Sequence, residues 1–204
     1  LGAEPVLVKG NVAVDADCRA LADVMARHGR IDALFCNAGK TTSRPAYAHQ
    51  LDKLTDEDFL DVYRVNVVGT FQTIRACREL LEQSDRAAVV VTSSVAGVTG
   101  NGSSIAYSAS KGALNTMVLT LAMGLAPRIR INALAPGFID TGWFDKLGPH
   151  RDKIRQSVAE RAPLKVASQP EDIAGSALFL ASEASCRVTG ETLSADAGLR
   201  MGGG

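Results

Sequence analysis

The stretch Ala87-Ala-Val-Val-Val-Thr-Ser-Ser94 decides the fold of this 204-residue chain. Its apolar run is typical of a strand that is buried on both faces of a parallel sheet. Ser94 ends the run, Tyr107 follows thirteen positions later, and Lys111 comes four positions after Tyr107. Polar groups just beyond the carboxyl end of such a strand lie where parallel sheets bind their ligands, so these three residues are candidates for one site.

Tyr107 and Lys111 are four positions apart, so in a helix over residues 103–126 their side chains lie on one face. An ammonium group beside a phenol stabilises the phenolate, and we expect Lys111 to lower the Tyr107 pKa from its usual value of about 10. Tyr107 could then exchange a proton with a substrate oxygen that Ser94 hydrogen-bonds. Because a Tyr-x-x-x-Lys pair alone is as easily surface chemistry, this interpretation depends on the surrounding motifs.

Strand and helix patterns alternate along the chain without a linker, a repeat or a low-complexity segment. The patterns predict strands near residues 5–9, 31–36, 87–93, 129–133 and 191–195, and helices near residues 15–28, 55–82, 103–126, 151–160 and 170–181. This alternation predicts a single α/β domain over residues 1–204 with a doubly wound parallel sheet. Asn37-Ala-Gly39, Ser94 and Pro136-Gly137 each follow a strand, so one crevice could hold them all.

The composition is that of an ordinary soluble enzyme domain with a sizeable core, with 46% hydrophobic residues and a formal net charge of zero. Zero charge argues against a nucleic-acid partner, and no apolar run approaches the length of a membrane span. The cysteines are scattered singly, which favours reduced thiols in a cytoplasmic protein, and the histidines lack metal-ligand spacing, so we expect no metal site. These residues are Cys18, Cys36, Cys77, Cys186, His28, His49 and His150.

Six motifs, in order and at matching spacing, resemble the signatures of the short-chain dehydrogenase/reductase family in its compact one-domain form. They are Cys36-Asn-Ala-Gly39, Asn66-Val-Val-Gly69, Thr92-Ser-Ser94, Tyr107-Ser-Ala-Ser-Lys111, Ile129-Arg-Ile-Asn-Ala-Leu-Ala-Pro-Gly137 and Val188-Thr-Gly-Glu191. The resemblance implies a Rossmann-type fold and an NAD(P)-dependent oxidoreductase that interconverts ketones and secondary alcohols by hydride transfer. Residues 97–102 and 190–193 look most like reductases of 3-oxoacyl thioesters, although sugar, polyol and steroid enzymes share much of both.

The resemblance also implies a role for each catalytic residue. Tyr107 transfers the proton of the substrate oxygen, Ser94 orients that oxygen, and Lys111 both tunes Tyr107 and holds the nicotinamide ribose. Asn66 belongs to a proton relay in which a water connects Lys111 to solvent; its alternative is a polar residue that kinks a helix. The implied cofactor-binding residues are Asn11, Val12, Asn37, Ala38, Gly39, Tyr107, Lys111, Pro136, Gly137, Ile139 and Thr141, and for Thr141 a helix cap is nearly as good an explanation.

The sequence contains no Gly-x-x-x-Gly-x-Gly loop of the kind that binds the cofactor pyrophosphate in the family. We therefore expect that roughly 45 residues, with the first two strands and their helices, precede Leu1 in the complete protein. The residue that separates NAD from NADP would lie there, so both cofactors stay open. Asn11-Val12 stands where relatives commonly have Asp-Val beside the adenine, and asparagine can still donate and accept hydrogen bonds.

Substrate contacts are expected at Ser94, Ala96, Tyr107, Trp143 and Phe144. Trp143 and Phe144 begin a segment bounded by glycine and proline, typical of a mobile lid over about residues 142–165. Packing of these two aromatic side chains onto the protein body is an equal alternative.

Two long predicted helices, over residues 55–82 and 103–126, carry apolar residues on more than one face. The resemblance implies that they pair across a two-fold axis and that the final strand makes a second contact, which gives a homotetramer. A catalytically idle nucleotide-binding or scaffold protein on the same fold stays open as a second functional class. The intact set of Asn66, Ser94, Tyr107 and Lys111 favours the enzyme, because an idle relative could lose any of them without unfolding.

Overall fold

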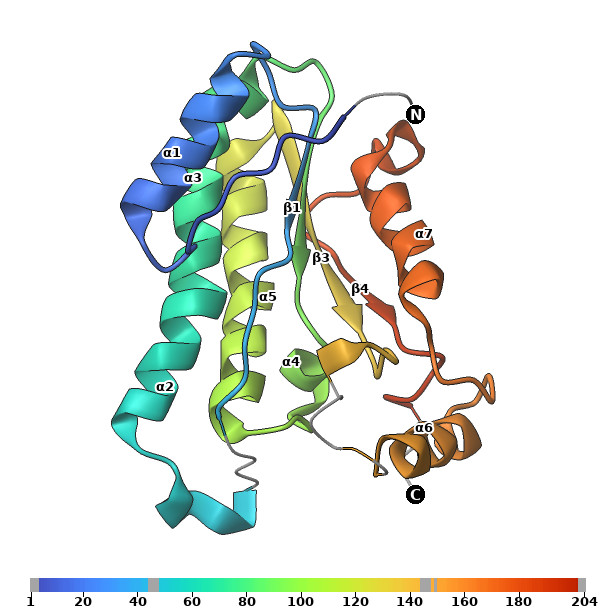
Figure 1. Cartoon of the computed structure of the whole chain (residues 1–204). Coiled ribbons are helices and arrows are strands. Elements are labelled where there is room, and N and C mark those ends of the chain that lie inside the picture. Colours follow the sequence, from blue (N-terminus) through green and yellow to red (C-terminus); the bar gives the residue numbers. More distant parts are fainter. Residues whose placement is uncertain (1–3, 44–47, 144–147, 149, 202–204) are drawn as a thin grey trace.

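The computed structural model describes residues 4–43, 48–143, 148 and 150–201. Within these residues four parallel strands form one sheet in the order β1-β2-β3-β4. The strands are β1 (Ala33–Cys36), β2 (Ala87–Thr92), β3 (Ile129–Pro136) and β4 (Thr192–Ala195). All four run in the same direction, so their carboxyl ends meet at one edge of the sheet, the lower end in Figure 1.

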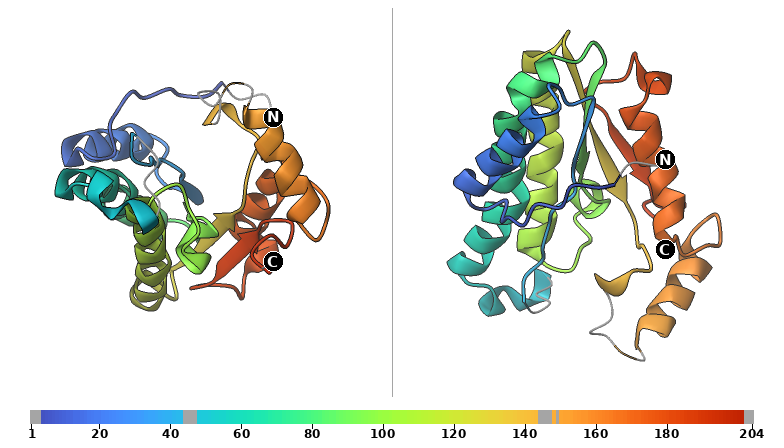
Figure 2. Two further views of the ribbon diagram at one scale, coloured as in Figure 1. Left: turned by 90° about the horizontal axis from the view of Figure 1, so that it is seen from below. Right: turned by 45° about the horizontal axis from the view of Figure 1, so that its top comes forward.

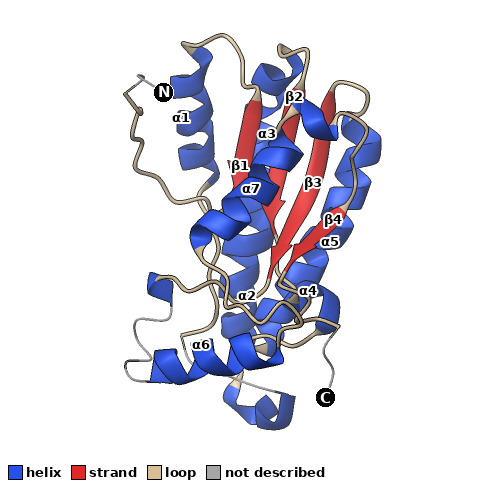
Figure 3. Ribbon diagram, turned by 90° about the vertical axis from the view of Figure 1, so that its right-hand side faces the viewer, coloured by secondary structure: helices blue, strands red, loops and turns tan. Residues whose placement is uncertain are grey.

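Helices cover both faces of this sheet, as Figures 1 and 2 show. One layer consists of α1 (Asp15–Ala26), α2 (Asp56–Tyr63), α3 (Thr70–Glu82) and α5 (Ile105–Leu125), with α3 packed on β1 and β2 and α5 on β3. On the opposite face α7 (Pro170–Ala181) packs on β2 and β3. Figure 3 shows α6 (His150–Arg161) below the sheet, and the shorter helical turns are α4 (Ala96–Thr99), η1 (Ala48–Lys53), η2 (Arg64–Gly69) and η4 (Glu183–Ser185).

The central strand β2 is buried from Ala87 to Val91, none of these residues being more than 2% exposed. Val89 and Val91 pack into the cluster beneath α3 and α5, while Val90 joins the cluster beneath α7. Burial on both faces explains why the strand is a continuous apolar run, since each buried valine contributes about 1.5–3 kcal/mol. The doubly wound parallel sheet predicted from the sequence is therefore confirmed.

One prediction of local structure was wrong, and one is refined. Residues 5–9 form no strand, and Val6, Leu7 and Val8 are 63%, 91% and 40% exposed. A strand needs a neighbour for its backbone N–H and C=O groups, and this segment pairs with none of the described strands. The helix predicted over residues 55–82 is confirmed as one helical stretch from Asp56 to Glu82, but its middle is the π-helical turn η2, which contains the buried Asn66.

None of the helices among the described residues is both long and apolar enough to span a bilayer.

Candidate active site

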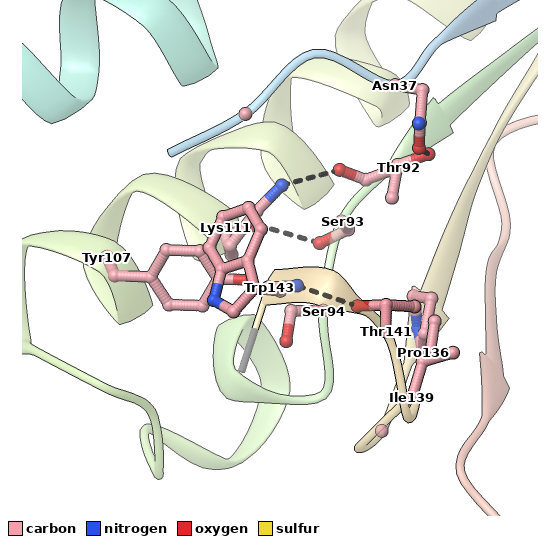
Figure 4. A pocket seen from close by; sticks show the side chains of 12 residues that line it. Asn37, Thr92, Ser93, Ser94, Tyr107, Lys111, Pro136, Ile139, Thr141 and Trp143 are labelled. Atoms are coloured by element: carbon pink, nitrogen blue, oxygen red, sulfur yellow. Dashed lines mark hydrogen bonds between the residues drawn. The ribbon is translucent and has the colours of Figure 1, made fainter. Parts of the chain in front are cut away.

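The carboxyl ends of β1, β2 and β3 open onto a cavity of about 260 Å³, shown in Figure 4. The sheet brings together side chains from four separate parts of the sequence at this edge. The lining residues are Asn37, Gly39, Thr92, Ser93, Ser94, Tyr107, Lys111, Pro136, Gly137, Ile139, Thr141 and Trp143. Most of the predicted site residues are therefore gathered in one place.

Tyr107 and Lys111 enter the cavity from the first turns of α5. Ser104 caps this helix, with its Oγ accepting a hydrogen bond from the Tyr107 backbone N–H at 3.1 Å. One turn later the Lys111 Nζ lies 5.7 Å from the centroid of the Tyr107 ring. The same Nζ donates a 2.7 Å hydrogen bond to the carbonyl oxygen of Thr92, at the end of β2. The cap fixes the backbone at Tyr107, and the bond to Thr92 fixes the Lys111 side chain relative to the strand.

Burial sets the protonation behaviour of this pair. Lys111 is 3% exposed, and desolvation lowers the pKa of its ammonium to about 8. Desolvation likewise raises the pKa of Tyr107, while a hydrogen bond with the Ser94 side chain acts in the opposite direction. The expected lowering of the Tyr107 pKa by Lys111 is thus wrong for this structure, because the Lys111 Nζ is bonded to Thr92 and desolvation dominates. Tyr107 is a neutral phenol near pH 7 and can donate a proton.

Asn66 connects the loop after β1 to α5. Its Nδ2 donates to the Lys40 carbonyl and to Ser110 Oγ, both at 2.9 Å, and its Oδ1 accepts from the Lys40 backbone N–H at 2.8 Å. The residue is completely buried in η2. These bonds hold the Gly39–Lys40 backbone against the turn of α5 that carries Tyr107 and Lys111. A contribution of Asn66 to a proton relay stays a prediction.

Two glycines line the cavity, and a side chain would clash at one of them. A Cβ atom on Gly39 would lie 3.5 Å from both Asn66 Oδ1 and Lys111 Nζ, and one on Gly137 would meet the Cβ of Asp196 at 2.8 Å. Gly137 therefore permits the close approach of β3 and β4 at this edge, and Gly39 leaves the Lys111 ammonium uncovered on one side.

Asn11 and Val12 lie elsewhere than the predicted active-site residues. They line a smaller cavity of about 170 Å³ with residues of the N-terminal segment, α1 and α3. Asn11 Oδ1 accepts from the Ala13 backbone N–H at 3.0 Å, and Val12 packs so closely on η2 that a Cβ on Gly69 would lie 2.8 Å from its Cγ2. Their expected contact with the cofactor adenine stays a prediction.

Two further predicted residues stand apart from the lining set. Ala96 supports Ser94 instead of lining the cavity, because its backbone N–H donates to Ser94 Oγ at 3.1 Å. Ala38 is likewise not among the lining residues. Phe144 lies outside the described residues.

The loop after β3 joins the cavity to the predicted lid. Trp143 lines the cavity and is half exposed, and its backbone N–H donates to Thr141 Oγ1 at 3.3 Å. Asp140 accepts a 2.7 Å hydrogen bond from Arg151 Nε in α6, and this bond is the main cause that lowers the Asp140 pKa. The ion pair fastens the start of α6 to the loop that carries Trp143.

Three polar residues of the site were missed from the sequence. Thr92 accepts from Lys111 through its backbone, which no sequence pattern can signal, while its Oγ1 donates to Asn37 Oδ1 at 2.9 Å. Ser93 and Asn115 hydrogen-bond behind Lys111. Ser93 lies inside a recognised motif, and that motif was the available signal. Among the described residues no cluster of three or more potential metal-ligating side chains is found.

Comparisons with known proteins find relatives over most of the chain. A family model described as enoyl-(acyl carrier protein) reductase matches residues 1–200. The chain is 39% identical over 177 residues to a 3-oxoacyl-[acyl-carrier-protein] reductase of Thermotoga maritima, a match that covers 86% of this chain and 69% of the relative. It is 36% identical over 212 residues to a glucose 1-dehydrogenase of Gluconobacter oxydans, covering 99% and 75%. A solved structure from Burkholderia xenovorans, described as a short-chain dehydrogenase/reductase, matches with a TM-score of 0.88 and 44% identity over 98% of this chain and 78% of the other.

Proposed function

The chain belongs to the short-chain dehydrogenase/reductase family, and on this premise we propose that it is an NAD(P)-dependent oxidoreductase that interconverts a ketone and a secondary alcohol. The observation that carries the proposal is the meeting of Ser94, Tyr107 and Lys111 in one cavity. As substrate class we propose 3-oxoacyl thioesters, because several relatives are named 3-oxoacyl-[acyl-carrier-protein] reductases. The glucose 1-dehydrogenase relative makes a sugar the competing substrate.

The residues of the cavity fit the nicotinamide end of the proposed cofactor. Lys111 presents a buried ammonium, a suitable donor for ribose hydroxyls, and Gly39 beside it carries no side chain that would block access. Pro136, Gly137, Ile139 and Thr141 would form the opposite wall. When bound, NAD(P) supplies or accepts the hydride. Both NAD and NADP are compatible with these residues.

The chain's own residues would manage the proton and the substrate oxygen. In the direction of reduction, Tyr107 as a neutral phenol donates its proton to the oxygen of the carbonyl group, and Ser94 holds that oxygen by a hydrogen bond. The Lys111 ammonium lies near the ring and stabilises the phenolate that results, even though burial dominates the pKa of the resting phenol. Asn66 keeps the neighbouring loop in place and is proposed to connect Lys111 to solvent through a water.

The segment over residues 142–165 is proposed as the substrate lid, with Trp143 and Phe144 in contact with the substrate. Trp143 supports this role because it lines the cavity while half of its side chain stays exposed. An indole in that position would favour an apolar part of the substrate.

We further propose a cytoplasmic homotetramer. Leu119 and Met123 of α5 are 54% and 77% exposed, and Leu178 of α7 is 67% exposed. Exposed large apolar side chains on helices of both layers favour burial against further copies of the chain.

The proposal is tested by following nicotinamide absorbance with NADH and NADPH against a panel of 3-oxoacyl thioesters, sugars and simple ketones. Tyr107→Phe should lower kcat by about 10²–10⁴ while cofactor affinity stays nearly unchanged, because only the proton donor is removed. Tyr63→Phe, in which a partly buried tyrosine of α2 is changed, is the matched control and should keep full activity. Absence of turnover on the whole panel would favour the idle nucleotide-binding protein instead. A loss below tenfold in Tyr107→Phe would show that Tyr107 is not the proton donor.

A further inference from the structure

Ser93 and Asn115 form a hydrogen-bonded pair directly behind Lys111. The single Ser93 O–H is shared between two acceptors, Asn115 Oδ1 at 2.6 Å and the Lys111 carbonyl oxygen at 3.1 Å. Asn115 Nδ2 in turn donates to the carbonyl oxygen of Gly97, at 3.2 Å. Ser93 is only 2% exposed. One hydroxyl and one amide therefore tie together the end of β2, the middle of α5 and the short helix α4.

This pair gives β2 a second contact with Lys111. The side chain of Lys111 is bonded through Nζ to Thr92, and its backbone carbonyl is bonded to Ser93, so two consecutive residues hold both ends of one lysine (Figure 4). Ser94 is the next residue of the same strand end. A displacement of α5 along β2 would break both bonds and would change the separation of Tyr107 from Ser94.

Close backbone packing supports the same arrangement from the other side. A Cβ atom on Gly97 would lie 2.5 Å from the backbone carbon of Lys111, so α4 and α5 touch through their main chains. Asn115 bonds to the carbonyl of this same glycine and thereby fixes the distance between the two helices. The hydroxyl of Ser93 is directed at α5 although the residue borders the cavity.

We propose that Ser93 and Asn115 are positioning residues that hold the Tyr107–Lys111 turn of α5 in register with Ser94. The inference rests on the proposed function, since it assigns to the two residues an effect on the proton-transfer geometry of that site. They act through the placement of Tyr107 and Lys111 and not by touching the reacting atoms. A pair of this kind differs from ordinary core hydrogen bonds because its loss would affect turnover more than folding.

The first test compares Ser93→Ala and Asn115→Leu with the control Ser84→Ala. Ser84 is also 2% exposed and also bonded through Oγ, to Asp32 Oδ1 at 2.6 Å, but it lies before the opposite end of β2. We expect kcat to fall by about 10- to 100-fold in the first two variants, because a misplacement of about 1 Å can cost that much, and to stay unchanged in Ser84→Ala. All three should lose a similar amount of Tm. Unchanged kcat in Ser93→Ala and Asn115→Leu, with the same loss of Tm, would make the pair merely structural and overturn the proposal.

Two further variants distinguish a positioning role of Ser93 and Asn115 from a general loss of stability. Ser93→Thr keeps the hydroxyl and should retain kcat within about threefold, whereas Ser93→Ala does not. The double variant Ser93→Ala/Asn115→Leu should be no slower than the slower single variant, because the two residues act as one unit. Losses that multiply in the double variant would contradict the proposed pair.

A readout without turnover keeps this inference distinct from the proposed function. Tyrosine labelled with ¹³C at Cζ gives one signal for each of the three tyrosines, and Tyr107→Phe assigns the one of interest. Among the described residues that line the cavity, Lys111 is the other ionisable group. When these signals are followed against pH, we expect the titration midpoint of Tyr107 to rise in Asn115→Leu, because the hydrogen bond between Tyr107 and Ser94 weakens. The midpoint should not change in Ser84→Ala. If the wild type turns over no substrate, the proposed function fails while this titration still decides the positioning. A Tyr107 midpoint unchanged in Asn115→Leu would refute it.

Discussion

Replacing Lys111 by methionine should abolish turnover and yet make the folded protein more stable at pH 7. Burial lowers the Lys111 pKa from 10.5 to about 8, and each pKa unit corresponds to about 1.4 kcal/mol, so the buried charge destabilises the folded state by about 3 kcal/mol. Methionine cannot donate to the Thr92 carbonyl oxygen, so the variant loses the hydrogen bond that Nζ makes there, at a cost of about 1.5–3 kcal/mol. Methionine fills a similar volume without a charge, so we expect a net gain of about 1 kcal/mol, or roughly 2–4 °C in Tm.

The pH dependence gives this prediction its sign. Between about pH 8 and pH 10.5 the unfolded chain holds a proton on Lys111 that the folded chain has lost, so wild-type stability gains with rising pH across this window. Lys111→Met lacks this gain. The stability of Lys111→Met relative to the wild type should therefore be largest below about pH 8 and should decrease toward pH 10.5.

Urea denaturation of both proteins at pH 7 and pH 9.5 measures the difference directly. Lys153→Met, which changes an exposed lysine of α6, is the matched control and should show no such pH-dependent difference. The reasoning is refuted if Lys111→Met is less stable than the wild type at pH 7, or if the difference between them is the same at both pH values.

Two further predictions concern the loop after β3. Asp140→Asn should accelerate hydrogen exchange in α6 but not in α7 at pH 7, because the ion pair with Arg151 is lost. Since the Asp140 pKa is lowered, exchange in α6 of the wild type should accelerate in the same way only below the usual titration range of aspartate. Equal exchange in the variant and the wild type at pH 7 would contradict this reasoning. Trp143→Ala should raise KM more for bulky apolar ketones than for small ones, as steady-state kinetics on both kinds would show; equal increases would mean that Trp143 only packs the lid.

The elements that the sequence predicted well are those in which burial and periodicity agree. The apolar run of β2 is buried on both faces, and α7 begins and ends where its pattern indicated, at Pro170 and Ala181. The segment over residues 5–9 has a strand-like composition but no strand beside it among the described residues. Composition reports the preference of a residue for a sheet, whereas a strand forms only when a neighbour supplies its backbone hydrogen bonds.

The sequence by itself determined the family, the doubly wound sheet and the residues that meet at its carboxyl edge. Each motif and each stretch of hydrophobic pattern is a local property of the chain, and their order can be seen directly along it. Only the tertiary structure decided how those residues behave. In the structure Lys111 is hydrogen-bonded to the Thr92 carbonyl oxygen, and Ser93 and Asn115 lie behind the site. The Tyr107 pKa is raised, whereas the spacing of Tyr107 and Lys111 predicted that it would be lowered. Desolvation and backbone hydrogen bonds depend on what surrounds a group in space, and residues distant in the sequence supply those surroundings.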